Sequence, residues 1–521
     1  MRMQTIKPVF LKRENMKVKK IIVACVLACV VFSSCFLLAA CGDKNKKNDK
    51  AIIYVTALFG GGLYDQETNE AVWEPFKTEI DAIKVMKGEM AMKEIVAHFK
   101  DEFSDILKLV GSAVSYKEGS LLWNLTLDNE GNSYNPNIAP ANGLPKDASG
   151  NVMDVSYGAF GIYKNFVDHI SAEYGDRYDV TVYNQDWRMS PAKSAAELEN
   201  FIERNGYKEV IFMSHSMGAP VVNNYLARSE ANRNKVKLYM GFAPATLGSF
   251  DALAAMACPD VYVDNFLGGM DLSGLPVDVY AIVDSVVNGK LGDFFRNNQG
   301  LMSLVPSWQL ISSDQYDDDN PAITVDGKAI TTKEELYDLY KSMRWAKYLV
   351  PRTKQEIKDS DDGADYARVL ATDGQPADKD GYRLKDFAAN LDEYFDNMFI
   401  NGKIASESIE NSYYFLGTGG ASTITNLELT TVKDEDGNIV YDDYGCVKYN
   451  YKLVTAGGAQ SKWGDGTVPY YSSIGGNTAT PEYIAALGDR LIELAGENHG
   501  MVGVDWDLLG PHVMNLLEKH A

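Results

Sequence analysis

The feature that most constrains the fold is a sharp corner between an expected strand and an expected helix. Residues 210–213 read Val-Ile-Phe-Met, a run typical of a buried strand, and residues 219–229 have helical character. The corner between them reads Ser214-His215-Ser216-Met217-Gly218. A serine with small residues two positions to either side, at such a corner, is the pattern of a nucleophile elbow, whose tight turn exposes the hydroxyl. Ser214 stands where glycine is commonest, but its side chain is small enough for the turn. We therefore predict that Ser216 is a nucleophile.

Strand-like and helix-like segments alternate along the chain, which favours a mostly parallel sheet flanked by helices. Residues 194–197 (Ser-Ala-Ala-Glu) have the form of a capping box, so we expect a helix to begin there and to end at Gly206. Together with the elbow, the alternation predicts an α/β-hydrolase fold over residues 51–521. The expected strands of its sheet are residues 51–57, 178–183, 210–213, 236–242, 413–416 and 490–494.

Two long stretches interrupt this alternation. Residues 64–175 separate the first two strands, and residues 250–410 follow the fourth strand. Insertions of this size on a compact sheet are typical of caps and lids over a site, so we expect a cap at 64–175 and a lid at 250–410. Residues 430–441, with Asp436-Gly437 at their centre, predict a structural hairpin.

A serine nucleophile needs a base and a carboxylate that orients the base, and in this fold they follow the serine in the order Asp, His. His499 lies in Gly-Glu-Asn-His-Gly, just after the last expected strand, and is the predicted base. His512 falls on the surface of an expected terminal helix, and His520 lies at the chain end, where we expect fraying. Asp465, between two glycines and ahead of His499, is the candidate acid. Its local sequence alone would favour an ordinary Asp-Gly turn, and its position is what favours the acid.

An oxyanion hole needs two backbone N–H donors. Met217, the residue after the nucleophile, is expected to supply one, and the loop after the first strand should supply the other. In that loop we choose Leu58 over Phe59. The glycines at 60–62 lack the Lys-Ser/Thr of a phosphate-binding P-loop and the spacing of a dinucleotide fingerprint.

The first forty residues have the anatomy of an export signal. A basic patch at Lys17, Lys19 and Lys20 precedes an apolar run at 21–38, which is nearly long enough to be a transmembrane anchor instead. The run ends in Leu-Ala-Ala-Cys41, which resembles the lipobox of bacterial lipoproteins, where the cysteine receives diacylglycerol. We therefore expect a signal peptide at 1–40, lipidation of Cys41, a polar tether at 41–50, and export to the cell surface or the periplasmic face of the membrane.

The net charge of the chain bears on which partners it can bind. The chain has 50 Lys and Arg against 72 Asp and Glu; without residues 1–40, which hold seven basic residues and one acidic residue, the net charge is −28. So acidic a surface argues against nucleic acid as a partner. The acidic runs lack the spacing of an EF-hand loop, and we expect no metal and no cofactor. Cys258 and Cys446 remain after the signal, and the sequence leaves open whether they pair.

Seven short motifs occur in one order over most of the chain: residues 55–63, 186–188 (Asp-Trp-Arg), 214–218, 243–249 (Ala-Pro-Ala-Thr-Leu-Gly-Ser), 303–307, 416–419 and 464–469 (Gly-Asp-Gly-Thr-Val-Pro). In this order they resemble the lecithin:cholesterol acyltransferase family, which includes phospholipid:diacylglycerol acyltransferase and lysosomal phospholipase. Gln185 stands where that family usually has tyrosine, the loop at 55–58 lacks its Pro-Gly, and residues 250–410 match only in patches.

The resemblance implies Ser216 as nucleophile, Asp465 as acid and His499 as base. It also implies acyl-enzyme chemistry on the esters of phospholipids or neutral lipids, by hydrolysis or by O-acyl transfer. The expected partners are a lipid or ester substrate and the membrane surface through Cys41, with no obligate protein partner. The alternative is a catalytically inactive lipid-binding surface lipoprotein with the same fold.

Overall fold

A parallel six-stranded sheet forms the centre of the protein. The computed structural model describes residues 48–68, 70–73, 124–127, 133, 135–140, 157–258, 298–342, 391, 394–420, 422–440, 448–456 and 463–521. The strands of the sheet are β1 (Lys50–Val55), β5 (Asp179–Tyr183), β6 (Glu209–His215), β7 (Val236–Phe242), β12 (Ser412–Thr418) and β15 (Leu491–Ala495). They lie in the order β15-β12-β7-β6-β1-β5, and every neighbouring pair is parallel. All six expected strands are therefore present, each to within two residues at both ends; the first ends at Val55, where the chain turns.

Alternating side chains along these strands feed two apolar layers. In β1, Ile52 and Tyr54 belong to one buried cluster, whereas Ala51, Ile53 and Val55 belong to the cluster on the opposite face. This two-residue alternation follows from the strand geometry, in which successive side chains point to opposite faces. Burial of each large aliphatic side chain contributes about 1.5–3 kcal/mol, so both layers need a helical cover.

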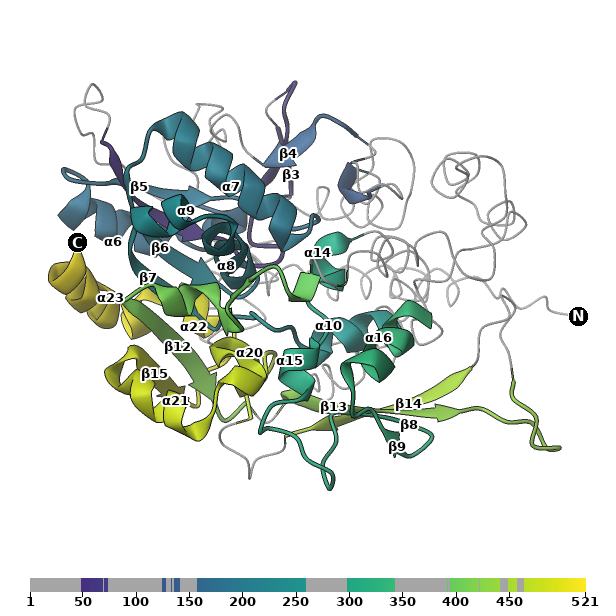
Figure 1. The fold of residues 1–521 in the computed structure, drawn as a ribbon. Helices are drawn as coiled ribbons and strands as arrows, with labels where there is room; N and C mark the ends of the chain where they lie inside the picture. The colour runs from purple at the N-terminus through teal and green to yellow at the C-terminus, as the bar shows by residue number, and fades with distance from the viewer. Residues whose placement is uncertain are drawn as a thin grey trace, which may run out of the picture.

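Helices cover both faces of the sheet (Figure 1). On the first face lie α6 (Lys164–Tyr174), α22 (Met501–Val504) and α23 (Trp506–His520); on the second lie α7 (Pro191–Asn205) and α8 (Gly218–Arg228). The predicted α/β-hydrolase architecture, a parallel sheet flanked by helices, is thus confirmed. Outside the second insertion, the other described helices are α9 (Glu230–Lys235), α20 (Tyr470–Ile474), α21 (Pro481–Leu487) and the 3-10 turns at Ala159–Gly161, Ala405–Ser408, Gly476–Thr478 and Gly488–Arg490.

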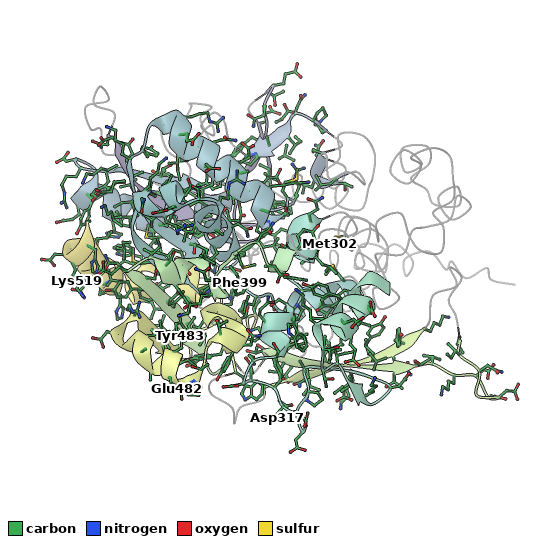
Figure 2. All side chains as sticks on the ribbon, in the orientation of Figure 1. Met302, Asp317, Phe399, Glu482, Tyr483 and Lys519 are labelled. Atoms are coloured by element: carbon green, nitrogen blue, oxygen red, sulfur yellow. The ribbon has the colours of Figure 1, made fainter. Side chains whose placement is uncertain are left out.

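The second expected insertion builds its own apolar core beside the sheet. Its described helices are α10 (Phe250–Ala257), α14 (Gln299–Met302), α15 (Trp308–Ile311) and α16 (Lys333–Ser342). Met302, labelled in Figure 2, is buried on α14 in the cluster that joins this insertion to Met217 and Trp187. The insertion therefore packs directly against the corner that carries Ser216.

Short strands in this insertion were not expected from sequence. The second sheet has the order β14-β13-β8-β9, and β8 pairs with β13 in parallel. Its strands are β8 (Ile323–Val325), β9 (Lys328–Ala329), β13 (Ile424–Thr431) and β14 (Tyr449–Thr455). Two small groups complete the described strands: β2 (Leu63–Asp65) with β3 (Glu70–Trp73) and β4 (Ile138–Pro140), and β10 (Phe399–Ile400) with β11 (Lys403–Ile404).

Two local expectations meet different outcomes. The hairpin expected at 430–441 is present, with Lys433 bridged to Ile439 around a turn at Gly437. The helix start expected at Ser194 is wrong: α7 begins at Pro191, and the Ser190 hydroxyl caps the Lys193 N–H. Proline fits the first helical position because its missing N–H would have no partner there. The end at Gly206 is confirmed, with Gly206 in the left-handed region at φ 73°.

Several of the predicted segments of the chain lie wholly or partly outside the residues that the structure describes. The signal at 1–40, Cys41, most of the tether at 41–50, and Cys446 lie outside the described part of the chain, and Cys258 is buried at the end of α10. The division into hydrolase body, cap and lid stays a prediction. Within the described part, no helix is long and apolar enough to cross a membrane.

Candidate active site

Ser216 sits at the corner between β6 and α8 in a strained backbone conformation. Its φ is 51°, a left-handed value that costs a residue with a β-carbon about 1–3 kcal/mol. Neighbouring backbone holds it there: the Ser216 N–H donates to the Phe242 carbonyl (3.0 Å), and the Ser216 carbonyl accepts from Ala219 (3.0 Å) and Ala245 (3.2 Å). The end of β7 thus fixes the turn that the elbow pattern predicted.

Gly218 brings the elbow against the end of the first strand. A β-carbon at Gly218 would lie only 2.4 Å from the Val55 carbonyl oxygen, so no larger residue fits without a shift of the backbone. This close approach places Met217, at the N-terminus of α8, on the same edge of the sheet as Leu58. Among the described residues, neither the Met217 N–H nor the Leu58 N–H has a hydrogen-bond partner. Both groups are therefore available to an oxyanion, as the sequence-based choice of donors requires.

The turn that carries Leu58 is held from both ends. The Gly60 N–H donates to the Ala57 carbonyl (3.0 Å), and Phe59 has φ 60°. The Trp73 indole N–H donates to the Phe59 carbonyl (2.7 Å), and the Ala57 N–H donates to Tyr163 Oη (3.0 Å). These bonds set the direction of the peptide groups on either side of Leu58.

The glycines at 60–62 serve packing. A β-carbon at Gly61 would lie 2.4 Å from the Gln185 carbonyl oxygen, and the Trp187 indole N–H donates to the Gly61 carbonyl (3.1 Å). The Gly62 N–H donates to Asn184 Oδ1 (3.1 Å). The glycine-rich loop is thus seated on the Asp-Trp-Arg motif that follows β5.

Asp465 and His499, the predicted acid and base, are in direct contact. His499 Nδ1 and Asp465 Oδ2 are 2.8 Å apart, and the His499 N–H donates to the Asp465 carbonyl (2.9 Å). The other carboxylate oxygen of Asp465, Oδ1, accepts the Thr467 N–H (3.0 Å) and the Val468 N–H (2.7 Å). A carboxylate at Nδ1 keeps the proton on that nitrogen and leaves Nε2 as the basic atom.

Both loops meet at the end of β12. A β-carbon at Gly417 would lie 2.3 Å from the Glu497 carbonyl oxygen and 2.9 Å from the β-carbon of Asp465. Residue 417 must therefore be glycine for the acid loop and the base loop to converge. The side chain of Asp465 is 4% exposed and that of His499 is 15% exposed, so the pair is shielded but reachable.

His499 reaches the elbow through His215. The two imidazole centroids are 5.3 Å apart, and His215 is the residue immediately before Ser216. The hydrogen bond of the His499 imidazole is to Asp465, and none joins it to the hydroxyl of Ser216. The structure brings Ser216, His499, Asp465, Met217 and the loop of Leu58 to one edge of the sheet, and their catalytic roles stay predictions.

The other histidines are separate from this arrangement. His215 is buried, and burial with the neighbouring His499 lowers its pKa to about 3, so it packs against the elbow as a neutral ring. His512 is exposed on α23, in agreement with its expected surface position. The expected fraying of His520 is wrong: it is the last residue of α23, and its Nε2 hydrogen-bonds to Tyr413 Oη (2.9 Å).

Arg188 is a residue whose role the sequence left undefined. It is 1% exposed, and its five N–H donors all have acceptors. Two pair with the carboxylate of Asp186 (2.9 and 2.7 Å), and three reach the Asn124 carbonyl (3.2 Å), Ser133 Oγ (3.0 Å) and the Ile138 carbonyl (3.1 Å). Arg188 therefore ties three described points of the first insertion to the loop after β5. Only the motif that contains Arg188 could have drawn attention to it.

Nothing in the described part of the chain indicates a metal site, since no group of three or more His, Cys, Asp or Glu side chains converges there.

One family model matches part of the chain. Residues 122–265 match the family model described as lecithin:cholesterol acyltransferase. The matched segment includes the Asp-Trp-Arg motif, Ser216 and Met217, whereas Asp465 and His499 lie outside it.

Similarity to solved structures is weak in sequence. A structure titled "The crystal structure of Tle4-Tli4 complex" aligns over 91% of this chain and 100% of that chain, with a TM-score of 0.46 and 13% sequence identity. No curated protein sequence matches the chain.

Proposed function

We propose that this protein is a serine-dependent lipid-ester hydrolase or O-acyltransferase that works through an acyl-Ser216 intermediate. The observation that carries the proposal is the Asp465–His499 pair, 2.8 Å between Oδ2 and Nδ1, beside a serine held at φ 51°. The match of residues 122–265 to the lecithin:cholesterol acyltransferase family model supports the same class of chemistry.

The reaction proceeds by two acyl transfers. His499 Nε2 takes the Ser216 proton as Oγ attacks the ester carbonyl, while the Met217 and Leu58 N–H groups donate to the oxyanion. The C–O bond to the leaving alcohol breaks, and that alcohol takes the proton from His499. Water or an acceptor alcohol then gives its proton to His499 and attacks the acyl-serine carbonyl; the bond from that carbon to Oγ breaks, and Oγ of Ser216 takes the proton back from His499. Asp465 keeps the same imidazole nitrogen protonated throughout.

An apolar surface beside the nucleophile supports a lipid acyl group as the substrate. Leu58, Phe59 and Trp73 are partly exposed and pack against the buried cluster that contains Met217. Phe59 and Trp73 have ring centroids 5.7 Å apart. Aromatic and aliphatic walls with two backbone donors among them are the usual composition of a site that binds an apolar ligand by one polar group.

A fluorophosphonate probe tests the nucleophile. Wild-type protein should be labelled, Ser216→Ala should not, and the control Ser214→Ala should be labelled because alanine fits a position that favours small residues. An unlabelled wild type would overturn the proposal. Lipid retained through purification without labelling would favour the inactive lipid-binding alternative.

Product analysis tests the substrate class. Phospholipid, triglyceride and short-chain esters are offered with and without an alcohol acceptor. Fatty-acid release alone identifies a hydrolase, and a new ester that forms with the alcohol identifies an acyltransferase. Labelling of Ser216 without release or transfer from any lipid would contradict the substrate class alone.

The cellular location is part of the proposal. The segment that ends in Leu-Ala-Ala-Cys41 supports lipid attachment at Cys41 and export to the cell surface or the periplasmic face of the membrane. Metabolic labelling with a radioactive fatty acid should mark the wild type and not Cys41→Ala. Equal labelling of both would refute the anchor.

A further inference from the structure

A buried hydrogen-bond chain runs behind the nucleophile and is not used by the proposed reaction. The Ala57 N–H donates to Tyr163 Oη (3.0 Å), Tyr163 Oη lies 3.3 Å from His215 Nδ1, and His215 Nε2 lies 3.2 Å from the His499 carbonyl oxygen. Tyr163 is fully buried and His215 is 5% exposed. The chain joins the residue before Leu58, the residue before Ser216 and the backbone of the base.

Geometry dictates the direction of each bond. The His499 carbonyl can only accept, so His215 carries its proton on Nε2. With a pKa near 3 the ring is neutral at physiological pH, so its Nδ1 accepts, and Tyr163 donates to it. Tyr163 Oη in turn accepts from Ala57. Only this arrangement of protons gives every polar atom of the hydrogen-bond chain a partner.

The backbone of His499 is consequently fixed at both of its polar groups. Its N–H donates to the Asp465 carbonyl (2.9 Å), and its carbonyl accepts from His215. The imidazole Nδ1 is held by Asp465 as well, so three points determine where Nε2 lies.

The surroundings of His215 hold the ring in place. Gly503, on α22 just after the base loop, approaches so closely that a β-carbon there would lie 2.2–2.3 Å from three atoms of the His215 ring. The Gly503 carbonyl accepts from Tyr54 Oη (2.5 Å), and the Tyr54 and Tyr163 rings are 4.4 Å apart. The ring therefore sits in a rigid slot between β1, α6 and α22.

We infer that Tyr163 and His215 are positioning residues, which hold the oxyanion turn and the base loop in register across Ser216. The inference rests on the proposed serine mechanism and adds two residues to it. Neither residue touches the reacting atoms, and both act through backbone groups next to those that do. A misplacement of about 1 Å in such a constellation costs about 10²-fold in rate, so loss of the chain should be visible in kinetics.

The test measures the rate constant of fluorophosphonate labelling per competent site. Active-site titration counts the competent sites, so a variant that merely unfolds loses sites, whereas a loss of positioning slows each site. We expect His215→Leu to lower the rate constant about 10- to 100-fold and Tyr163→Phe about 10-fold. With an ester substrate, kcat should fall and KM should stay within about twofold, since binding groups are unchanged.

Two further variants serve as a rescue and as a control for the loss of the hydrogen-bond chain. His215→Gln keeps an amide N–H that can reach the His499 carbonyl, so it should recover most of the activity lost in His215→Leu. Tyr414→Phe is the matched control: its buried Oη bonds to Ser406 Oγ (2.9 Å) at the other face of the sheet, and its labelling rate constant should equal that of wild type.

Wild-type rate constants in both His215→Leu and Tyr163→Phe, at whatever number of sites, would overturn the inference and leave the serine mechanism standing. An unlabelled wild type would overturn the mechanism and the inference together. If His215→Leu yields no folded protein, Tyr163→Phe alone decides the outcome.

Discussion

The buried His215 should make the stability of the protein depend on pH in a way that one substitution removes. In the folded protein its pKa is lowered from 6.5 to about 3, chiefly because burial disfavours the imidazolium. In the unfolded chain the ring is solvated and titrates near 6.5. Below pH 6.5 the unfolded state therefore binds a proton that the folded state does not, and stability falls as the pH falls.

The size of this effect follows from the two pKa values. One pH unit inside the window between about 3 and 6.5 is worth about 1.4 kcal/mol, so the His215 contribution lost between pH 7 and pH 5 is about 2 kcal/mol. Above pH 6.5 the ring is neutral in both states and contributes no slope. Below pH 3 it is protonated in both states, and the contribution is again constant.

The assay is urea unfolding followed by tryptophan fluorescence, at pH 7 and pH 5, for wild type and His215→Gln. Glutamine does not titrate, so the loss of unfolding free energy between the two pH values should be about 2 kcal/mol smaller in the variant than in wild type. Comparison of the two differences cancels the carboxylates, which both proteins share. Equal losses in the two proteins would refute the view that His215 is held neutral in its slot.

Three further predictions concern the acid, the slot and the first insertion. Asp465→Asn should lower kcat about 10⁴-fold with KM little changed. The two backbone N–H groups that bind Oδ1 would hold the amide oxygen and turn the amide NH₂ towards His499, so the imidazole would carry its proton on Nε2 instead of Nδ1. Steady-state kinetics on a soluble ester checks this, and a near-normal kcat would contradict it. Gly503→Ala should lower the free energy of unfolding in urea by about 1–3 kcal/mol, since the new methyl group meets the ring of His215. Alanine in a helix would otherwise raise the stability, so a gain in stability would show that the slot around His215 is loose. Arg188→Lys should cost about 3–5 kcal/mol in the same assay because the partly buried carboxylate of Asp186 and the backbone carbonyls lose donors. A cost below 1 kcal/mol would count against the view that Arg188 ties the first insertion to the loop after β5.

Local chemistry was enough to predict the scaffold of the site. Five of the six strands of the central sheet are short runs rich in β-branched and aromatic residues, and such runs need both faces of a parallel sheet covered whatever lies elsewhere in the chain. The elbow is equally local, because a strand, a small-Ser-small turn and a helix must meet within a few residues. Gly206 ends α7 for the same kind of reason, since only glycine adopts a left-handed φ without strain.

Local patterns were wrong where two of them compete or where a distant contact intervenes. Ser194 and Ser190 both resemble a helix cap, and the proline after Ser190 decides between them. His520 would fray in an isolated helix, but Tyr413 from β12 holds it. The strands β8 and β9 are too short to be recognised from sequence: β8 exists because β13 offers it an edge, and β9 pairs in turn with β8.

The sequence by itself determined that a serine stands on a strained corner with a carboxylate and a histidine after it in the right order. Only the tertiary structure decided that Asp465 and His499, 34 residues apart, touch at 2.8 Å, because that contact depends on two loops that converge at Gly417. It alone revealed Tyr163, which carries no motif and reaches His215 across 52 residues. Strand and turn preferences act over a few residues, whereas a hydrogen-bond chain through the core exists only once the sheet has brought its ends together.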